Sequence, residues 1–279
     1  MDEASQRRAG VARLFDSLAP VYDQSGVPFF GPIAERLLSL IAPRTGERGA
    51  DIGCGRGAVT LPLARALGQE GHVTAVDLSA SMVELLAARA ADLELGPIDT
   101  RVGDSAEVGL APGSYDLVTA SLVLFFAPDP LGTLTHWVSL LRPTGRIGIT
   151  TFGDQDEAWR AVDDVFTPFL PPHLLDPRTT TDDDPFASTD GLHRLFTAAG
   201  ADDVESHEER LEITFAGADD WRAWTMTTGQ RAFWAAVPSD QVDEVLARAT
   251  TALDRARGID GRIHLGNVVR YTTATRPYL

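Results

Sequence analysis

The chain has 279 residues, 44% of them hydrophobic, which is enough to bury a substantial core. Its 40 Asp and Glu residues outnumber its 24 Lys and Arg residues, and the formal charge of −16 argues against a nucleic-acid or anionic-membrane partner. No stretch approaches the roughly 20 apolar residues needed to span a bilayer, the charged first ten residues lack a signal peptide's apolar run, and the single Cys54 cannot form an internal disulfide. We therefore expect a cytoplasmic protein with no nucleic-acid and no membrane partner.

Two helical patterns come first along the chain. Residues 11–23 carry apolar side chains on one helical face, and Pro20 closes that pattern. Residues 32–41 repeat apolar side chains every three or four positions, with Pro32 suited to the first turn. We expect residues 1–45 to form an N-terminal helical segment.

Five short apolar runs follow and alternate with helical patterns. Strands that alternate with helices are typical of a doubly wound α/β fold, whose parallel strands are joined by right-handed crossovers. We expect residues 46–152 to form a Rossmann-like core. Its expected strands are residues 50–52, 72–78, 99–104, 115–125 and 146–152.

The alternation stops after residue 152. Residues 153–188 mix a helical start with a Pro-rich, acidic loop, which we interpret as a cap insertion over the sheet. A helix over residues 189–200 follows, with Thr189 as its cap and Gly200 as its stop.

Two more strands are expected near the end of the chain, at residues 203–215 and 261–276, with a helical stretch at 217–257 between them. Strands joined in this way can add an antiparallel edge to a parallel sheet. The sequence thus predicts a mostly parallel, seven-stranded sheet with an antiparallel edge and helical cap elements. Residues 189–279 would complete the core and carry a helical insertion at 216–260.

The stretch GADIGCGRGAVT, residues 49–60, joins the first expected strand to a helical pattern. A strand, a glycine-rich turn and a helix bring backbone N–H groups and the positive end of the helix toward a ligand. Gly53, Gly55 and Ala58 also satisfy the dinucleotide pattern G-x-G-x-x-[GA], so their spacing does not exclude NAD. Asp51, however, would repel a pyrophosphate and suits a ligand that carries an amino group or a sulfonium.

Acidic residues close the next two expected strands. Asp77 lies 24 residues after Gly53, where a carboxylate accepts hydrogen bonds from the ribose hydroxyls of either kind of ligand. Asp104 and Ser105, in GDSAEV, close the third strand. A carboxylate there can accept a hydrogen bond from an adenine amine, for which a dehydrogenase has less use.

Five segments over residues 10–152 together resemble the class I S-adenosylmethionine-dependent methyltransferases. DIGCGRG resembles their first motif, AVDLS their ribose motif, GDSAEV their adenine motif, and YDLVTASLVLFFAPDP and LRPTGRIGITTF their fourth and fifth strands. The resemblance implies S-adenosyl-L-methionine as the cofactor, its methionyl part on the glycine turn, its ribose on Asp77 and its adenine beside Asp104. The implied cofactor-binding set is Tyr22, Asp51, Gly53, Cys54, Gly55, Asp77, Leu78, Asp104, Ser105 and Ser121.

Tyr22 lies where related enzymes fold an N-terminal lid over the cofactor, so the resemblance makes residues 1–45 a lid. The alternative is an ordinary amphipathic tyrosine with its hydroxyl in water. A departure from the family is the end of the fourth strand, Leu124, Phe125 and Phe126, which lacks the His or acid that some members use as a base. The catalytic residues therefore stay unknown at this point.

Aromatic residues are frequent in the part of the chain that matches poorly, and they could wall a pocket for an apolar acceptor. We expect the acceptor to be lined by Phe29, Phe126, Phe152, Trp221 and Trp224. His207, Glu208 and Glu209 are alternative proton acceptors, although a surface position suits them too.

No metal is expected, because the six histidines include no pair at metal spacing. The acidic run Asp182, Asp183 and Asp184 lies in a Pro- and Thr-rich loop and favours a solvated surface over a Mg²⁺ site. Cys54 has no assignable base partner and is interpreted as a small residue of the loop rather than a nucleophile.

The hypothesis is a methyltransferase that acts on a small molecule, a natural product or an isoprenoid- or quinone-like acceptor, by in-line transfer in a capped pocket. Three alternatives stay open: a cyclase or decarboxylase that binds the same cofactor, an NAD-dependent oxidoreductase, and a non-catalytic binding module. The sequence does not decide whether the chain forms a homo-oligomer.

Overall fold

A single seven-stranded sheet organises the computed structural model, which describes residues 3–171 and 184–278. The strand order is β3-β2-β1-β4-β5-β7-β6. The pairs formed among β1 to β5 are parallel, and β7 is antiparallel to both β5 and β6, which confirms the predicted mostly parallel sheet with an antiparallel edge. The strands are β1 (Arg48–Ile52), β2 (His72–Asp77), β3 (Ile98–Val102), β4 (Tyr115–Ser121), β5 (Leu141–Gln155), β6 (Asp202–Phe215) and β7 (Ile263–Thr275).

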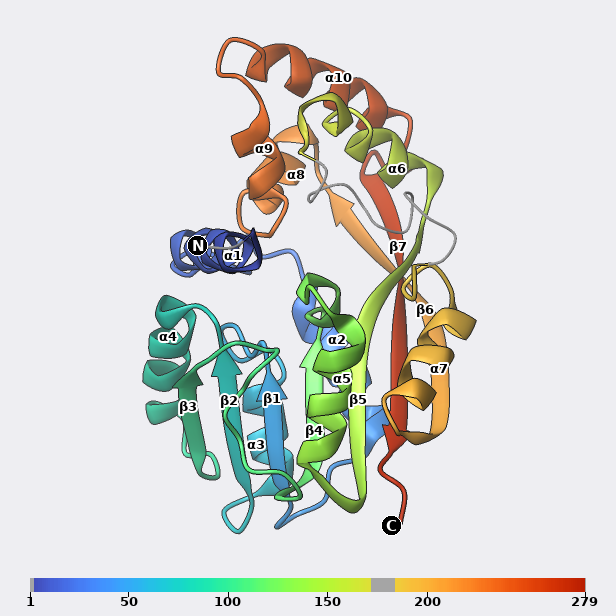
Figure 1. Ribbon diagram of the computed structural model, residues 1–279. Coiled ribbons are helices and arrows are strands. Elements are labelled where there is room, and N and C mark those ends of the chain that lie inside the picture. The colour runs from blue at the N-terminus through green and yellow to red at the C-terminus, as the bar shows by residue number, and fades with distance from the viewer. Residues whose placement is uncertain (1–2, 172–183, 279) are drawn as a thin grey trace.

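Helices cover both faces of this sheet (Figure 1). On one face lie α2 (Phe30–Ile41), α3 (Thr60–Leu67) and α4 (Ala80–Ala91), and on the other α5 (Pro130–Leu140) and α7 (Thr189–Ala198). Alternate strand residues serve the two faces, as the period of a β-strand requires. On β2, Ala75 packs with Leu86 of α4, whereas Val76 belongs to the cluster around Trp137 of α5.

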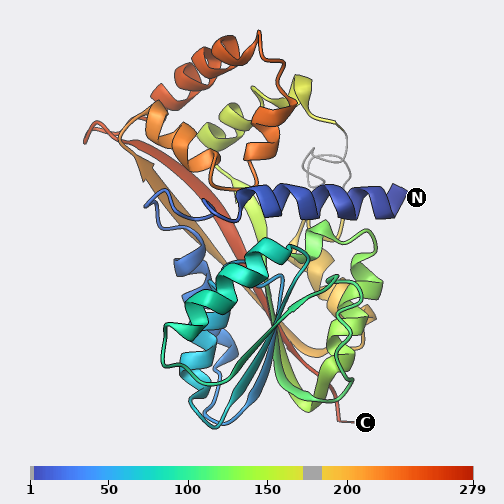
Figure 2. The ribbon, with the colours of Figure 1, turned by 90° about the vertical axis from the view of Figure 1, so that its left-hand side faces the viewer.

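The two N-terminal helices occupy different places in the fold. Helix α1 (Glu3–Leu18) lies across the carboxyl ends of the parallel strands, between the sheet and the helices at the far end of the molecule (Figures 1 and 2). Helix α2 instead packs on the sheet, where Leu37 and Ile41 lie against Gly148 of β5. Helix α1 therefore lies over the strand ends and α2 belongs to a layer on the sheet, and the expected lid over residues 1–45 stays a prediction.

Beyond the other strands, β5, β6 and β7 extend into a second group of helices (Figure 1). We call this group the cap; it comprises α6 (Glu157–Asp163), α8 (Ala218–Thr225), α9 (Arg231–Ala236) and α10 (Val242–Asp254). Tryptophan and phenylalanine rings fill its interior, and Phe166 contacts Trp221, Phe233 and Trp234. The division of the chain into lid, core and insertions stays a prediction.

Some boundaries differ from the expected ones for identifiable reasons. Strand β5 runs to Gln155 because β7 pairs along its length, up to the pair Gln155–Asn267. Helix α7 is capped by Ser188, whose Oγ accepts a hydrogen bond from the N–H of Gly191 at 3.0 Å, so the expectation of a Thr189 cap was wrong.

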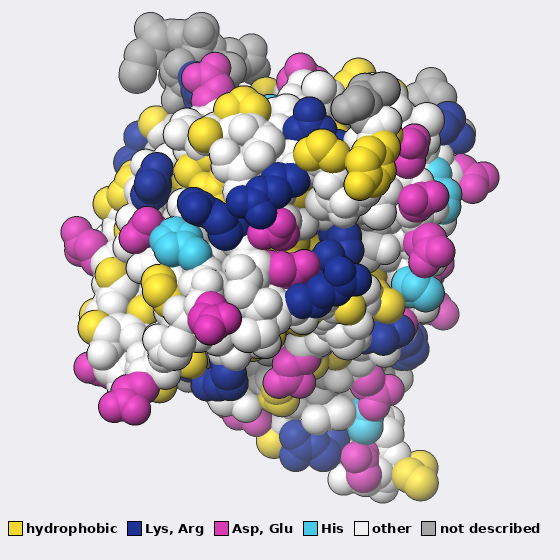
Figure 3. Space-filling view, turned by 90° about the horizontal axis from the view of Figure 1, so that it is seen from below, with side chains coloured by type: hydrophobic (Ala, Val, Ile, Leu, Met, Phe, Trp, Pro, Cys, Tyr) yellow, Lys and Arg dark blue, Asp and Glu magenta, His cyan; other side chains and the backbone are white. Residues whose placement is uncertain are grey.

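The end of the molecule opposite α1 carries the amino ends of the parallel strands. Seen from that end, arginine and acidic side chains are interspersed (Figure 3). Two of the ion pairs there join Arg142 to Asp116 and Arg146 to Glu47, both at 2.8 Å. Among the described residues, no helix is long and apolar enough to cross a membrane.

Candidate active site

The glycine turn after β1 has a backbone that only glycine adopts easily. Gly53, Gly55 and Gly57 have φ values of 69°, 50° and 90°, in the left-handed region. A Cβ on Gly53 would overlap the side chain of Val123, whereas a Cβ on Gly55 would meet nothing closer than 4.0 Å, on the ring of Tyr22. The turn is thus packed on its inner side and open toward the ring of Tyr22.

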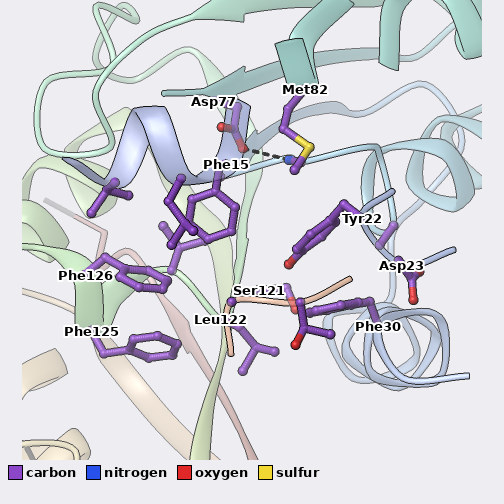
Figure 4. Close-up of a pocket in the computed structure, with 18 of the residues that line it drawn as sticks. Phe15, Tyr22, Asp23, Phe30, Asp77, Met82, Ser121, Leu122, Phe125 and Phe126 are labelled. Atoms are coloured by element: carbon purple, nitrogen blue, oxygen red, sulfur yellow. Dashed lines mark hydrogen bonds between the residues drawn. The ribbon is translucent and has the colours of Figure 1, made fainter. Parts of the chain in front are cut away.

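Asp77, at the end of β2, is bound to this turn. Its Oδ2 accepts from the N–H of Gly55 at 2.8 Å, and its Oδ1 accepts from the N–H of Ser79 at 2.9 Å (Figure 4 shows the carboxylate at the cavity). Burial raises the pKa of Asp77, and these backbone donors oppose the rise. Each carboxylate oxygen keeps lone pairs for a further donor.

Asp51, in β1, lies below the turn and is 1% exposed. Its two oxygens accept hydrogen bonds from the hydroxyls of Thr60, at 2.5 Å, and Thr119, at 2.8 Å. Burial raises its pKa to about 6 against the effect of those two donors. A cationic ligand group nearby would favour the ionised form of this carboxylate.

The strands on either side contribute two more polar positions. After β3, Asp104 accepts at its Oδ1 from the N–H of Ala106 at 2.9 Å, and Trp137 donates to the carbonyl of Ser105 at 2.7 Å. At the end of β4, the hydroxyls of Ser121 and Thr150 lie 2.9 Å apart. These bonds fix the loops that border the glycine turn.

The chain turns sharply after Ser121. Leu122 has a φ of 60°, a conformation that costs a branched side chain strain energy, and its N–H donates to the carbonyl of Thr150 at 3.1 Å. Figure 4 places Leu122 at the cavity, between Ser121 and Phe125. The hydrogen bond to Thr150 holds this backbone conformation at a residue that lines the cavity.

Helix α1 is bound to residues on both sides of the turn. Asp16 accepts from the hydroxyl of Ser79 at 2.6 Å and from the N–H of Ser81 at 3.2 Å, both at the start of α4. Arg8 pairs with Asp104 at 2.8 Å. Beyond the helix, Tyr22 stacks on Phe30 with ring centroids 4.9 Å apart.

These groups share one cavity of about 630 Å³. All ten residues of the expected cofactor-binding set line it, from Tyr22 through the glycine turn and Asp77 to Ser121. Of the expected acceptor-lining residues, Phe29, Phe126, Phe152 and Trp224 line it as well.

Trp221 does not line the cavity, so its expected place there needs correction. The residue is 1% exposed, and its ring lies against Phe166 and Trp234 in the interior of the cap. Trp221 and Trp224 are close to one turn of α8 apart, and only Trp224 is on the side that reaches the cavity.

Several residues that line the cavity belong to no motif and were not among the residues expected to line it, although Trp159 and Phe233 belong to the aromatic-rich part of the chain that was expected to wall a pocket. Aromatic ones are Phe125, Trp159, Phe186 and Phe233, and polar ones are Thr151, Gln155, Asp163, Gln230 and Asn267. They come from the segment after β4, from β5, α6, α9 and β7, and from the segments before α7 and α9, which are far apart in the sequence. The fold alone brings them together at the cavity.

No histidine is among the described residues that line the cavity. The alternative proton acceptors His207, Glu208 and Glu209 lie on β6 outside it, where Glu208 binds Arg270 and Glu209 binds Arg36. Burial raises the pKa of the Tyr22 hydroxyl and of the Cys54 thiol, so neither forms an anion readily. Asp23, whose pKa burial raises to about 6, is one of the carboxylates that line the cavity.

No group of three or more His, Cys, Asp or Glu among the described residues is arranged to hold a metal ion. Asp182 and Asp183 of the acidic run, and His173, lie outside the described residues. Asp184 is described, and its Oδ1 accepts from the N–H of Phe186 at 2.7 Å.

Comparisons with known proteins identify the family of the chain. A methyltransferase-domain model matches residues 50–145. Over 275 residues the sequence is 35% identical to a nocamycin O-methyltransferase from Saccharothrix syringae, covering 95% of this chain and 94% of that protein. The chain belongs to the class I S-adenosylmethionine-dependent methyltransferases.

One further relative and one solved structure are similar to this chain. The aklanonic acid methyltransferase DauC of a Streptomyces species (strain C5) is 35% identical over 176 residues, which cover 63% of this chain and 80% of that protein. The crystal structure of the YcgJ protein from Bacillus subtilis superposes with a TM-score of 0.59 at 14% identity and covers 88% of this chain and 98% of that one. The latter likeness shows the shared fold alone.

The cofactor of this methyltransferase is S-adenosyl-L-methionine, and the residues present fit it. The glycine turn leaves open space where a Cβ on Gly55 would stand, Asp77 has lone pairs to spare, and Asp51 supplies negative charge for a cationic group. The carboxylate of Asp51 does not suit a diphosphate, and nothing in the comparisons supports the dinucleotide reading.

Proposed function

We propose that this methyltransferase methylates an acidic oxygen of a flat, largely apolar small molecule, a natural product of the polycyclic or quinone-like kind. The observation that carries the proposal is the continuity of the cavity, which joins the polar glycine turn to a wall of aromatic rings around Phe152, Trp159 and Trp224. Aromatic walls favour flat apolar ligands through burial and ring contacts.

We call the part of the cavity beside the glycine turn the polar half, and the part lined by aromatic rings the aromatic half. Residues of the polar half would hold the cofactor. In this proposal the N–H groups of the turn and Asp51 take the methionyl part, Asp77 the ribose hydroxyls, and Asp104 with Ser105 the adenine. Leu78 and Met82 line this half and provide apolar contact. When bound, S-adenosylmethionine supplies an electrophilic methyl group on a sulfonium sulfur.

Residues of the aromatic half would orient the acceptor and exclude water. Methyl transfer from a sulfonium is an in-line displacement that gains most from positioning, so the protein need not supply a strong base. The cavity wall offers carboxylates such as Asp23, with a pKa of about 6, and no histidine among its described residues. Without a histidine base among the described residues of the wall, the reaction is easiest for an acceptor whose oxygen loses its proton near neutral pH by itself, as in a carboxylic acid or a strongly acidic enol.

The names of two relatives support an oxygen acceptor of this kind. One is a nocamycin O-methyltransferase, and the other acts on aklanonic acid. Methylation at nitrogen has less support from the cavity, since a protonated amine would first have to lose a proton to a base.

The proposal is tested by incubating the protein with S-adenosylmethionine and a panel of aromatic carboxylic acids, phenols and amines of one to four rings. Mass spectrometry should detect an acid heavier by one methyl group together with released S-adenosylhomocysteine. An isomer of equal mass, or a product lighter by carbon dioxide, would instead indicate a cyclase or a decarboxylase. Methylation of amines in preference to acids would contradict the oxygen acceptor.

A further inference from the structure

Four polar side chains form a cluster at the cap end of the otherwise aromatic half. Asp163 of α6 accepts hydrogen bonds from the Nε2 atoms of Gln155 at 3.1 Å and Gln230 at 3.0 Å. Asn267 of β7 is paired with Gln155 in the β5–β7 register. All four residues line the cavity, and we call them the amide cluster.

Two oxygens of the amide cluster have no hydrogen-bond partner among the described residues. They are Oε1 of Gln230 and Oδ1 of Asn267, both buried. The orientation of the Gln230 amide is set by its Nε2, which donates to Asp163, so the unpaired atom is the acceptor. Asn267 is 2% exposed on a strand paired on both sides.

An unpaired polar atom in a buried wall costs free energy unless a ligand pairs with it. Asn267 is the sole asparagine of the sequence, and an apolar residue at its position would have suited the surrounding aromatic wall. Both unpaired atoms are oxygens, which accept hydrogen bonds. The partner that matches them is a hydrogen-bond donor such as a hydroxyl group.

The amide cluster lies well away from the glycine turn. Thr150 of β5 is bound to Ser121 at the turn's edge, and Gln155 follows five residues later along the same strand. A strand rises by about 3.3 Å per residue, so the cluster is roughly 15 Å further along β5. An acceptor that reaches both places needs the length of about three fused rings.

We propose that the amide cluster is a recognition subsite for the acceptor, and that it binds a hydroxyl group at the end of the molecule opposite the methylated oxygen. The inference rests on the proposed function for the direction of the acceptor, but not for the binding of the hydroxyl. Gln230 and Asn267 would accept the hydrogen bond, while rings such as Trp224 and Phe233 contact the scaffold between the two ends. These residues set specificity and take no part in bond breaking.

The test uses two probes of the required length, anthraquinone-2-carboxylic acid and 6-hydroxyanthraquinone-2-carboxylic acid, which differ by one hydroxyl at the far end. Binding to the full chain saturated with S-adenosylhomocysteine is followed by quenching of tryptophan fluorescence, since Trp159 and Trp224 line the cavity. We expect the hydroxylated probe to bind about tenfold more tightly, the ratio expected for one hydrogen bond to a buried acceptor. In Asn267→Leu the ratio should fall to within about twofold of one.

Phe233→Leu is the matched control, because it removes ring contact from the same wall and should weaken both probes alike. Gln230→Met is a second variant in which we expect the preference for the hydroxylated probe to be lost. It provides the test if Asn267→Leu does not fold. A preference near one in the unaltered protein, a failure of both probes to bind, or a preference that survives both variants would overturn the proposal.

Two readouts separate this inference from the proposed function. Methyl ester formed on both probes without a hydroxyl preference would overturn the subsite and leave the proposed function standing. Tighter binding of the hydroxylated probe without formation of a methyl ester would support the subsite and contradict the proposed function. Without any ligand, Asn267→Leu should raise the unfolding midpoint by about 2 °C, because it removes an unpaired buried polar group; a lowered midpoint would contradict the account of that atom.

Discussion

The half of the cavity beside the glycine turn is made by backbone groups and carboxylates, whereas the half beside the cap is made by aromatic rings and a few amides. The first half comes mostly from the carboxyl ends of the strands β1 to β4, and its polar groups are paired, as with Asp51 and Asp77. The second half is assembled from segments spread over more than a hundred residues, and it keeps unpaired acceptors.

The difference between the two halves suggests how this fold separates binding of the cofactor from binding of the acceptor. A fixed cofactor demands a fixed backbone, which the positive φ angles of the turn and its packing against Val123 provide. In the proposed function the acceptor contacts side chains of the second half, and those side chains can change without disturbing the turn. Substitutions in the first half should therefore change cofactor binding, and substitutions in the second should change acceptor binding and leave the turn intact.

The largest effect is expected for Gly53→Ala. The added Cβ would overlap Val123 and would also sit at a φ of 69°, so we expect a loss of about 3 kcal/mol or more in unfolding free energy, from overpacking and backbone strain together. Denaturant unfolding measures this loss. Gly46→Ala is the control, since its φ is 85° with nothing near its Cβ, and it should lose about 1 kcal/mol. Equal losses would show that Val123 does not restrain the turn.

Two tryptophans of α8 sharpen the comparison within the cap. Trp221→Leu should lower the unfolding free energy by about 2 to 3 kcal/mol, since the ring is buried in the cap interior, and should leave the relative affinity for different acceptors unchanged. Trp224→Leu should change acceptor KM several-fold as well. The pair is compared by unfolding and by steady-state kinetics, and identical acceptor profiles for both variants would contradict the assignment of Trp224 to the wall.

Asp77→Ala should weaken S-adenosylhomocysteine binding by about 1 to 3 kcal/mol, through lost charged hydrogen bonds to the ribose and the release of the Gly55 N–H. Titration calorimetry measures this change. Asp77→Asn, which keeps an acceptor oxygen, should lose less. An unchanged affinity in Asp77→Ala would argue against the placing of the ribose.

The smallest effect concerns pH. The pKa of Asp51 is raised to about 6 in the folded protein, above its usual 3.8, so the folded state binds the extra proton between these values. Its contribution to stability is therefore present below about pH 4 and lost as pH rises through 6. A cationic cofactor prefers the ionised carboxylate, so its affinity should fall by up to about tenfold between pH 7.5 and 5.

Calorimetry at the two pH values tests this expectation. Asp51→Asn should reduce the slope, with a remainder from the neighbouring carboxylates of Asp77 and Asp23, whose pKa values burial also raises. Cofactor affinity that rises as the pH is lowered would contradict the assigned role of Asp51.

Sequence reasoning reached the two halves unequally for a physical reason. The sheet and the cofactor half of the cavity could be predicted from local features of the sequence. A turn with φ above zero needs glycine, and the carboxylates of this half lie at the ends of strands that the sequence pattern locates. The place of Trp221 was wrong because both tryptophans of α8 are apolar and buried, and only packing decides which one reaches the cavity. Gln230 and Asn267 gave no signal, since their proximity depends on the β5–β7 register.

The most direct measurement is a crystal structure of the protein with S-adenosylhomocysteine. The account predicts the ribose hydroxyls on the carboxylate of Asp77, the homocysteine part on the turn at Gly53 and Gly55, and the sulfur facing the aromatic half near Phe152 and Trp224. A ligand bound away from the turn, or with its sulfur directed away from those rings, would contradict the central claim.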